Sequence, residues 1–265
     1  MLAITLYILS LIIILTFTTA VFFIAQFKKD NSIIDTAYGL GFIVTAYFLV
    51  GMFPGQLQIS PYSQLIFFLI LFWGLRLSFR IFRKNRNKPE DFRYQAWRKE
   101  WSKKGYLYYV SRSYLQIFIL QGFIISLVLL PFTLSLTTST AQGQSIFYGL
   151  LIWMIGFFFE VVGDRQLDRF IKNKNPNKGQ IMKTGLWKYT RHPNYFGEAT
   201  MWVGIAYIAY MATGYLAVFI SPFVITYLLL FVSGIPMLEK KWKGIPEWEE
   251  YKQKTSAFFP LPPRD

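Results

Sequence analysis

The chain has 265 residues, of which 54% are hydrophobic and 20% aromatic, and it carries a formal net charge of +14 at pH 7. A soluble domain of this length could not bury so much apolar surface, so the composition indicates a membrane protein. The absence of cysteine excludes disulfides and thiolate chemistry, and the single histidine excludes a histidine-rich metal site, so no bound metal is predicted.

Apolar runs long enough to cross a hydrocarbon core, which takes about 20 residues, recur along the chain. The first run lacks a basic N-terminal region and is too long for a signal peptide, so we expect it to be retained. The fold class predicted is all-α, a polytopic seven-transmembrane helix bundle in a single membrane domain over residues 1–265. The seven spans are predicted at residues 2–27, 32–53, 61–82, 113–136, 144–163, 195–213 and 215–236.

Lysine and arginine accumulate in alternate loops between these spans. The segments 28–31, 83–112 and 164–194 and the tail from 239 are basic, whereas the intervening loops carry no charge. Because basic loops stay in the cytoplasm, this alternation predicts an N-terminus outside and a C-terminus inside. In this topology the basic loops face the anionic headgroups of the membrane, which accounts for most of the positive net charge. Nucleic acid is therefore not predicted as a partner.

Polar side chains within the spans mark candidate sites, because they are costly at membrane depth unless they have partners. Asp35 and Tyr38 lie three residues apart, hence on one face at the start of the second span. Arg76 and Arg80 lie four apart in the third span. Structural ion pairs between helices are the alternative interpretation of each group.

Further candidates follow the third span. The segment 83–112 mixes aromatic residues with cations, which is typical of an interfacial helix or an ordered loop. Glu160, Asp164 and Asp168 step by four along the end of the fifth span and form an acidic stripe.

The corner "LWKYTRHPNYFGE" at residues 186–198 holds the only histidine. Pro193 suits a first helical turn, and Asn194 and Glu198 follow it near free backbone N–H groups that favour an anion. Together with the acidic stripe, this corner predicts a pocket open to the cytosol.

The segments "KPEDFRY", "GDRQLDRF", "NKGQIMKTG", "GLWKYTRHPNYFGE", "VSGIPMLEKK" and "YKQKTSAFFPLPP" carry a resemblance. They resemble a bacterial membrane protein family whose C-terminal part is similar to steroid 5α-reductases, and more distantly to isoprenylcysteine carboxyl methyltransferases and sterol reductases. The resemblance implies a bacterial inner membrane location. It also implies a lipid-substrate side over residues 1–112 and a 5α-reductase-like cofactor-binding part over residues 113–265.

The same resemblance implies that NADPH enters from the cytosol and that a lipid-like enone lies deeper between the helices. Arg191 and His192 would belong to the loop that closes over the cofactor. The full set of residues implied for the cofactor site is Asp164, Tyr189, Arg191, His192, Asn194, Glu198, Glu239 and Tyr251.

The implied reaction delivers hydride to the β carbon of a conjugated carbonyl while a donor stabilises the enolate oxygen. A tyrosine oriented by a carboxylate keeps its proton at pH 7, so the catalytic residues predicted are Tyr38 and Asp35. The Gln-Glu pair and the third-span tyrosine of the steroid enzymes are absent from "KKDNSIID" and "GLRLSF". The sequence therefore specifies neither a steroid nor an oligomeric state.

Two other functions stay open. An S-adenosylmethionine-dependent lipid methyltransferase would share the "RHPxY" corner, but its cofactor has no phosphate for the Lys and Arg residues of segment 165–191. A non-enzymatic transporter or binding protein is the alternative from another class. Transport predicts broken helices or repeated halves, and the outer halves of the spans are uniformly apolar.

Overall fold

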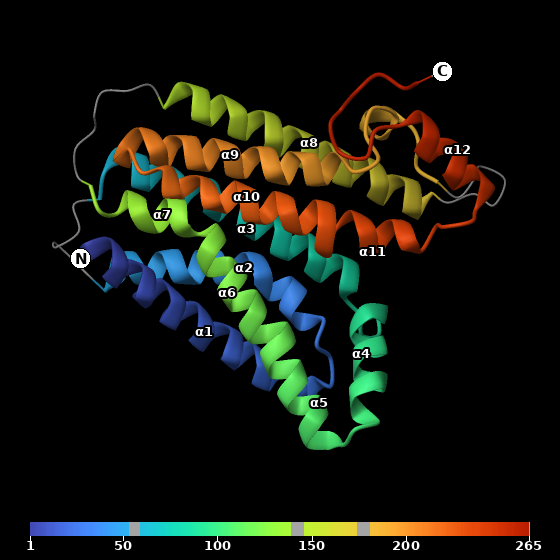
Figure 1. The fold of residues 1–265 in the computed structure, drawn as a ribbon, viewed down its shortest axis with the longest axis horizontal. Coiled ribbons are helices and arrows are strands. Elements are labelled where there is room, and N and C mark those ends of the chain that lie inside the picture. The colour runs from blue at the N-terminus through green and yellow to red at the C-terminus, as the bar shows by residue number, and fades with distance from the viewer. Residues whose placement is uncertain (53–58, 139–145, 174–180, 265) are drawn as a thin grey trace. The chain divides into compact units, whose positions relative to one another are not determined.

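The computed structural model describes residues 1–52, 59–138, 146–173 and 181–264, which are helical and contain no strand, so the all-α prediction is confirmed. Figure 1 labels the α-helices in chain order. They are α1 (Leu2–Lys28), α2 (Ile33–Gly51), α3 (Pro61–Asn85), α4 (Phe92–Ser102), α5 (Tyr106–Ser113), α6 (Leu120–Val128), α7 (Leu130–Ser135), α8 (Phe147–Lys172), α9 (Pro193–Thr213), α10 (Ile220–Tyr227), α11 (Ile235–Lys240) and α12 (Pro246–Lys254). Short π-helical segments are η1 (Tyr114–Ile119) and η4 (Leu228–Val232), and short 3-10 segments are η2 (Gly185–Lys188) and η3 (Leu216–Phe219).

Six helical segments in the described ranges are long and apolar enough to cross a membrane. They are Leu2–Lys28, Ile33–Gly51, Pro61–Asn85, Tyr106–Val128, Phe147–Lys172 and Leu216–Lys240. The seventh predicted span corresponds to α9, a 21-residue helix that is not among the six. The count of seven and the orientation therefore stay predictions.

The bounds predicted for the fourth span were wrong. A single helix was expected over 113–136, but the helix begins at Tyr106, ends at Val128 and is followed by the separate helix α7. Pro131 lies in the first turn of α7, where its missing N–H and its ring prevent the preceding helix from continuing. The last span is interrupted in the same way, since Pro236 opens α11.

The chain divides into two compact units. Unit 1 comprises residues 1–144 and 209–218, and unit 2 comprises residues 145–208 and 219–265. In unit 1, α1 contacts α2 and α6, α2 contacts α3, and α4 contacts α5. Its apolar cluster where α4 meets α1, α2 and η1 contains Val21, Phe22, Ala25, Ile34, Ala37, Tyr94, Trp101, Tyr109, Ile117 and Phe118.

In unit 2, α8 and α9 run antiparallel and pack through facing glycines (Figure 1). A Cβ atom on Gly156 would lie 2.5 Å from the amide nitrogen of Met201 and 2.6 Å from the carbonyl oxygen of Gly197. Seven residues away, Gly149 meets Gly204 in the same manner. Two helix backbones can approach this closely only at positions where neither helix has a side chain. The glycines therefore determine where α9 begins relative to α8.

Candidate functional site

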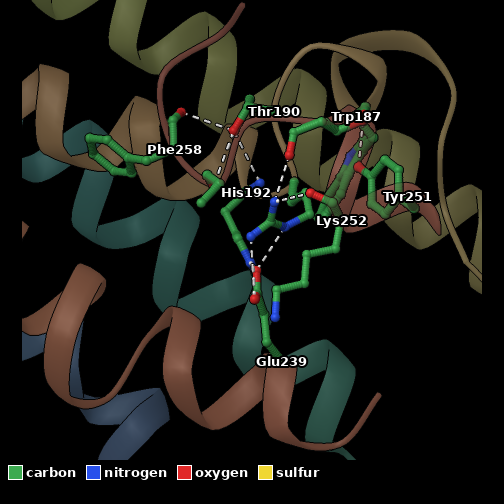
Figure 2. Close-up of polar contacts among 10 residues, drawn as sticks. Trp187, Thr190, His192, Glu239, Tyr251, Lys252 and Phe258 are labelled. Atoms are coloured by element: carbon green, nitrogen blue, oxygen red, sulfur yellow. Dashed lines mark hydrogen bonds and ion pairs between the residues drawn. The ribbon is translucent and has the colours of Figure 1, made fainter. Parts of the chain in front are cut away.

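Buried polar residues gather in unit 2 where α9 begins (Figure 2). Thr190, Arg191 and His192 directly precede α9, and none of them is more than 7% exposed. Pro193 then occupies the first helical position, where its missing N–H costs nothing. A Cβ atom on Gly163 of α8 would lie 3.1 Å from Cγ of Pro193, so α8 holds this start of the helix in place.

Arg191 is the centre of the cluster. Its Nε donates to Oε1 of Glu239 at 2.9 Å and its Nη2 to Oε2 at 3.3 Å. Its Nη1 donates to the carbonyl oxygens of Lys252 at 3.2 Å and Thr255 at 2.5 Å. The guanidinium carbon also lies 5.8 Å from the ring centroid of Trp248. Because all three guanidinium nitrogens are engaged within the protein, Arg191 joins the start of α9 to Glu239 and to the C-terminal region.

His192 shares the same carboxylate. Its Nε2 lies 3.0 Å from Oε1 of Glu239, and its ring stacks on Tyr195 with centroids 5.4 Å apart. Burial lowers the pKa of His192 below its usual value of 6.5, and the adjacent Arg191 lowers it further, although Glu239 opposes both effects. His192 is therefore neutral at pH 7 and donates its Nε2 proton to Glu239.

The C-terminal segment 255–261 runs beside the residues that precede α9. The hydroxyl of Thr190 donates to the carbonyl oxygen of Phe258 at 2.9 Å, and the backbone N–H of Arg191 donates to Ser256 at 2.8 Å. Figure 2 shows Thr190 and Phe258 joined in this way. The corner predicted from sequence is therefore built from two chain segments about 65 residues apart.

Tyr251 and Tyr189 lie at the edge of this cluster. The hydroxyl of Tyr251 donates to the carbonyl oxygen of Trp187, whose indole N–H donates to Gly163 at 3.0 Å. Burial raises the pKa of Tyr251, so its proton stays in this bond. The side chain of Tyr189 is 43% exposed, and its backbone carbonyl accepts from Leu261.

An open pocket of about 440 Å³ adjoins the cluster. It is lined by Pro236, Glu239, Lys240, Lys243, Trp248, Glu249 and Lys252. The charge of Glu239 is already balanced by Arg191, so the three lysines outweigh the one remaining carboxylate, Glu249, and leave the pocket positive. Ammonium groups in this number suit the phosphates of an anionic ligand.

The other predicted cofactor residues lie on α8 and α9. Asp164 is 3% exposed on α8, and Glu198 is half-buried on α9. The side-chain oxygen of Asn194 is buried and has no hydrogen-bond partner among the described residues. A Cβ atom on Gly163 would lie 3.3 Å from the backbone nitrogen of Asn194, so the end of α8 is close to this first turn of α9.

The predicted catalytic pair lies in unit 1. Asp35 accepts from Nη2 of Arg93 at 2.8 Å and from the hydroxyl of Tyr94 at 2.6 Å. The ring of Tyr38 packs edge-on against Trp73, with centroids 6.5 Å apart. Burial and the neighbouring Asp35 raise the pKa of Tyr94 well above 10, so this phenol remains a donor. Sequence reasoning missed Arg93 and Tyr94, although both lie in the quoted segment "KPEDFRY".

A second ion pair joins α4 to the turn between α1 and α2. Arg98 donates to both carboxylate oxygens of Glu90 at 2.8 Å, and Glu90 also accepts from the backbone N–H of Asn31 at 2.7 Å. The segment between the third and fourth spans is thus an ordered part of unit 1, anchored by two carboxylates.

Comparisons with known proteins agree with the resemblance seen in the sequence. Residues 21–255 match a family described as "Protein of unknown function (DUF1295)". The protein named steroid 5-alpha-reductase DET2, from Arabidopsis thaliana, is 26% identical over 157 residues, which cover 53% of this chain. The match covers 57% of that protein, so this chain spans little more than half the length of the curated relative. No solved structure matches the chain.

Proposed function

The chain belongs to the DUF1295 family, and from this premise and its similarity to a steroid 5-alpha-reductase we propose that it is a membrane-embedded reductase. The proposed reaction is the NADPH-dependent reduction of a conjugated C=C bond in a lipid or steroid-like substrate, in a bacterial inner membrane. The observation that carries the proposal is the buried cluster of Arg191, His192 and Glu239 beside a lysine-lined pocket.

The donor set of this region fits a phosphorylated dinucleotide. Lys240, Lys243 and Lys252 would hold phosphates at the pocket, while Arg191 positions Glu239 and the chain around it. The buried oxygen of Asn194 would accept from a hydroxyl or a carboxamide N–H. NADPH, when bound, supplies a hydride. The complete set proposed for this site remains Asp164, Tyr189, Arg191, His192, Asn194, Glu198, Glu239 and Tyr251.

NADPH is expected to stabilise the detergent-purified protein more than NADH or S-adenosylmethionine does. A ligand present at 100 times its Kd adds about 2.7 kcal/mol to the free energy of unfolding. The change Lys243→Gln should weaken NADPH binding about fivefold, because one exposed phosphate contact is lost. The melting temperature is measured by tryptophan fluorescence over a ligand titration. It gives both the stabilisation by each cofactor and the change in affinity for NADPH.

The change Lys103→Gln removes an equally exposed lysine from unit 1 and should leave the NADPH titration unchanged. If S-adenosylmethionine alone stabilised the protein, the proposed reductase would be wrong, and a methyltransferase that uses the same corner would be the function supported. If none of the three cofactors raised the melting temperature, the proposed cofactor site would be wrong.

Tyr38 and Asp35 are proposed as the donor pair of the reaction, on the basis of their spacing and position in α2. Replacing Tyr38 with phenylalanine should abolish turnover of an enone lipid and leave NADPH binding intact, because only the phenolic hydroxyl group is removed. Tyr47→Phe, at an exposed position of the same helix, is the matched control and should keep full turnover. Product formation by mass spectrometry measures both variants, and retained turnover in Tyr38→Phe would remove Tyr38 from the mechanism.

A further inference from the structure

Two cations lie against one tyrosine ring at the start of α5. Gly105 has a φ of 101°, a conformation that residues with a Cβ atom rarely adopt, and it directly precedes α5. Its carbonyl oxygen accepts from the N–H of Tyr109 at 3.1 Å and so begins α5. This geometry places Nζ of Lys104 over the ring of Tyr108, 5.1 Å from the centroid.

Arg112, one turn further along α5, lies against the same ring. Its guanidinium carbon is 6.0 Å from the centroid of Tyr108 and 5.8 Å from that of Trp101. Aromatic faces attract cations but carry no net charge, so the two positive charges are not neutralised by these contacts.

No carboxylate compensates these charges within the described ranges. The neighbouring Arg93 and Arg98 form ion pairs with carboxylates, whereas Lys104 and Arg112 form none. Glu100 is the acidic residue in segment 92–113, which also contains exposed Lys99 and Lys103. The turn therefore presents a net positive surface.

An exposed apolar stripe begins at the same place. Leu107 is 80% exposed and Leu115 is 58% exposed, and they lie eight residues apart on one face of the helical segment Tyr106–Val128. This segment is one of those able to cross a membrane, and it starts at the turn (Figure 1). Cations at the end of a span and apolar side chains along it match the two parts of a phospholipid, an anionic headgroup and an acyl chain.

We propose that the α4–α5 turn is a binding surface for an anionic phospholipid. The headgroup phosphate contacts Lys104 and Arg112, and an acyl chain lies along Leu107 and Leu115. This surface is independent of the proposed reductase function, because its residues lie in the α4–α5 turn, in α5 and in η1, and none belongs to the proposed cofactor or donor sites.

The test uses the full chain purified in detergent, with phosphatidylglycerol or phosphatidylcholine added at equal concentrations and bound lipid counted by native mass spectrometry. The wild type should retain phosphatidylglycerol preferentially. Lys104→Gln and Arg112→Gln should each weaken its retention about fivefold, the effect of one cation near a lipid surface. Lys103→Gln removes an adjacent exposed lysine that has no aromatic partner and should have little effect.

Equal retention of the two lipids by the wild type would overturn the proposal, and so would equal losses in Lys103→Gln and Lys104→Gln. Displacement of the lipid by millimolar inorganic phosphate would also overturn it, because the surface would then recognise a soluble anion. If either variant fails to fold, the wild type still tests the proposal. Its preference for phosphatidylglycerol should decrease between about 0.05 and 0.5 M salt, and an unchanged preference would contradict a charge-based surface.

Discussion

Replacing Glu239 with glutamine is expected to lower the free energy of unfolding by about 3 kcal/mol, because it leaves a buried arginine without its counter-charge. Arg191 is 7% exposed and forms its ion pair with this carboxylate. The same change replaces the charged acceptor of His192 with a neutral amide. The melting temperature in detergent should fall, and stabilisation by NADPH should fall with it, since the cluster joins the start of α9 to the C-terminal region.

Glu249→Gln is the matched control for this prediction. Glu249 lines the same pocket and accepts a hydrogen bond from the backbone of Gly244 at 3.1 Å in an exposed setting. An exposed carboxylate of this kind contributes little, so the control should change stability by less than about 0.5 kcal/mol. Equal melting temperatures for the two variants would mean that the backbone carbonyls of Lys252 and Thr255 suffice to hold Arg191.

Replacing Gly156 with leucine is expected to destabilise unit 2 by more than about 3 kcal/mol. The atoms nearest to the new Cβ are backbone atoms of α9, at 2.5 Å and 2.6 Å, and backbone atoms cannot move aside as a flexible side chain can. The helices would have to separate, which would also displace the start of α9. The yield of monodisperse protein and its melting temperature measure the effect.

The control for this prediction is Gly51→Leu at the end of α2, where a Cβ atom would meet no atom within 4 Å. It should stay within about 0.5 kcal/mol of the wild type. Gly156→Ala should fall between the two leucine variants, because it introduces the clash but no further atoms. If Gly156→Leu melts like the wild type, α8 and α9 do not pack through their glycines.

The family resemblance identified Arg191, His192 and Glu239 in advance, but it did not show how they interact. Arg191 meets Glu239 across 48 residues of sequence and Thr255 across 64. Spacing rules apply within one helix, so they could not predict a cluster built from three segments. The same limit hid Tyr94, which reaches Asp35 across 59 residues.

The sequence by itself determined the helical class, the approximate positions of the six long apolar segments and the basic character of the loops. These properties depend on local hydropathy and charge, which each segment carries whatever its neighbours are. Only the tertiary structure decided that the fourth span starts at Tyr106, that glycines bring α8 against α9, and that Glu239 balances Arg191. Each of these depends on which distant side chains or backbones come within contact distance, and packing alone determines that.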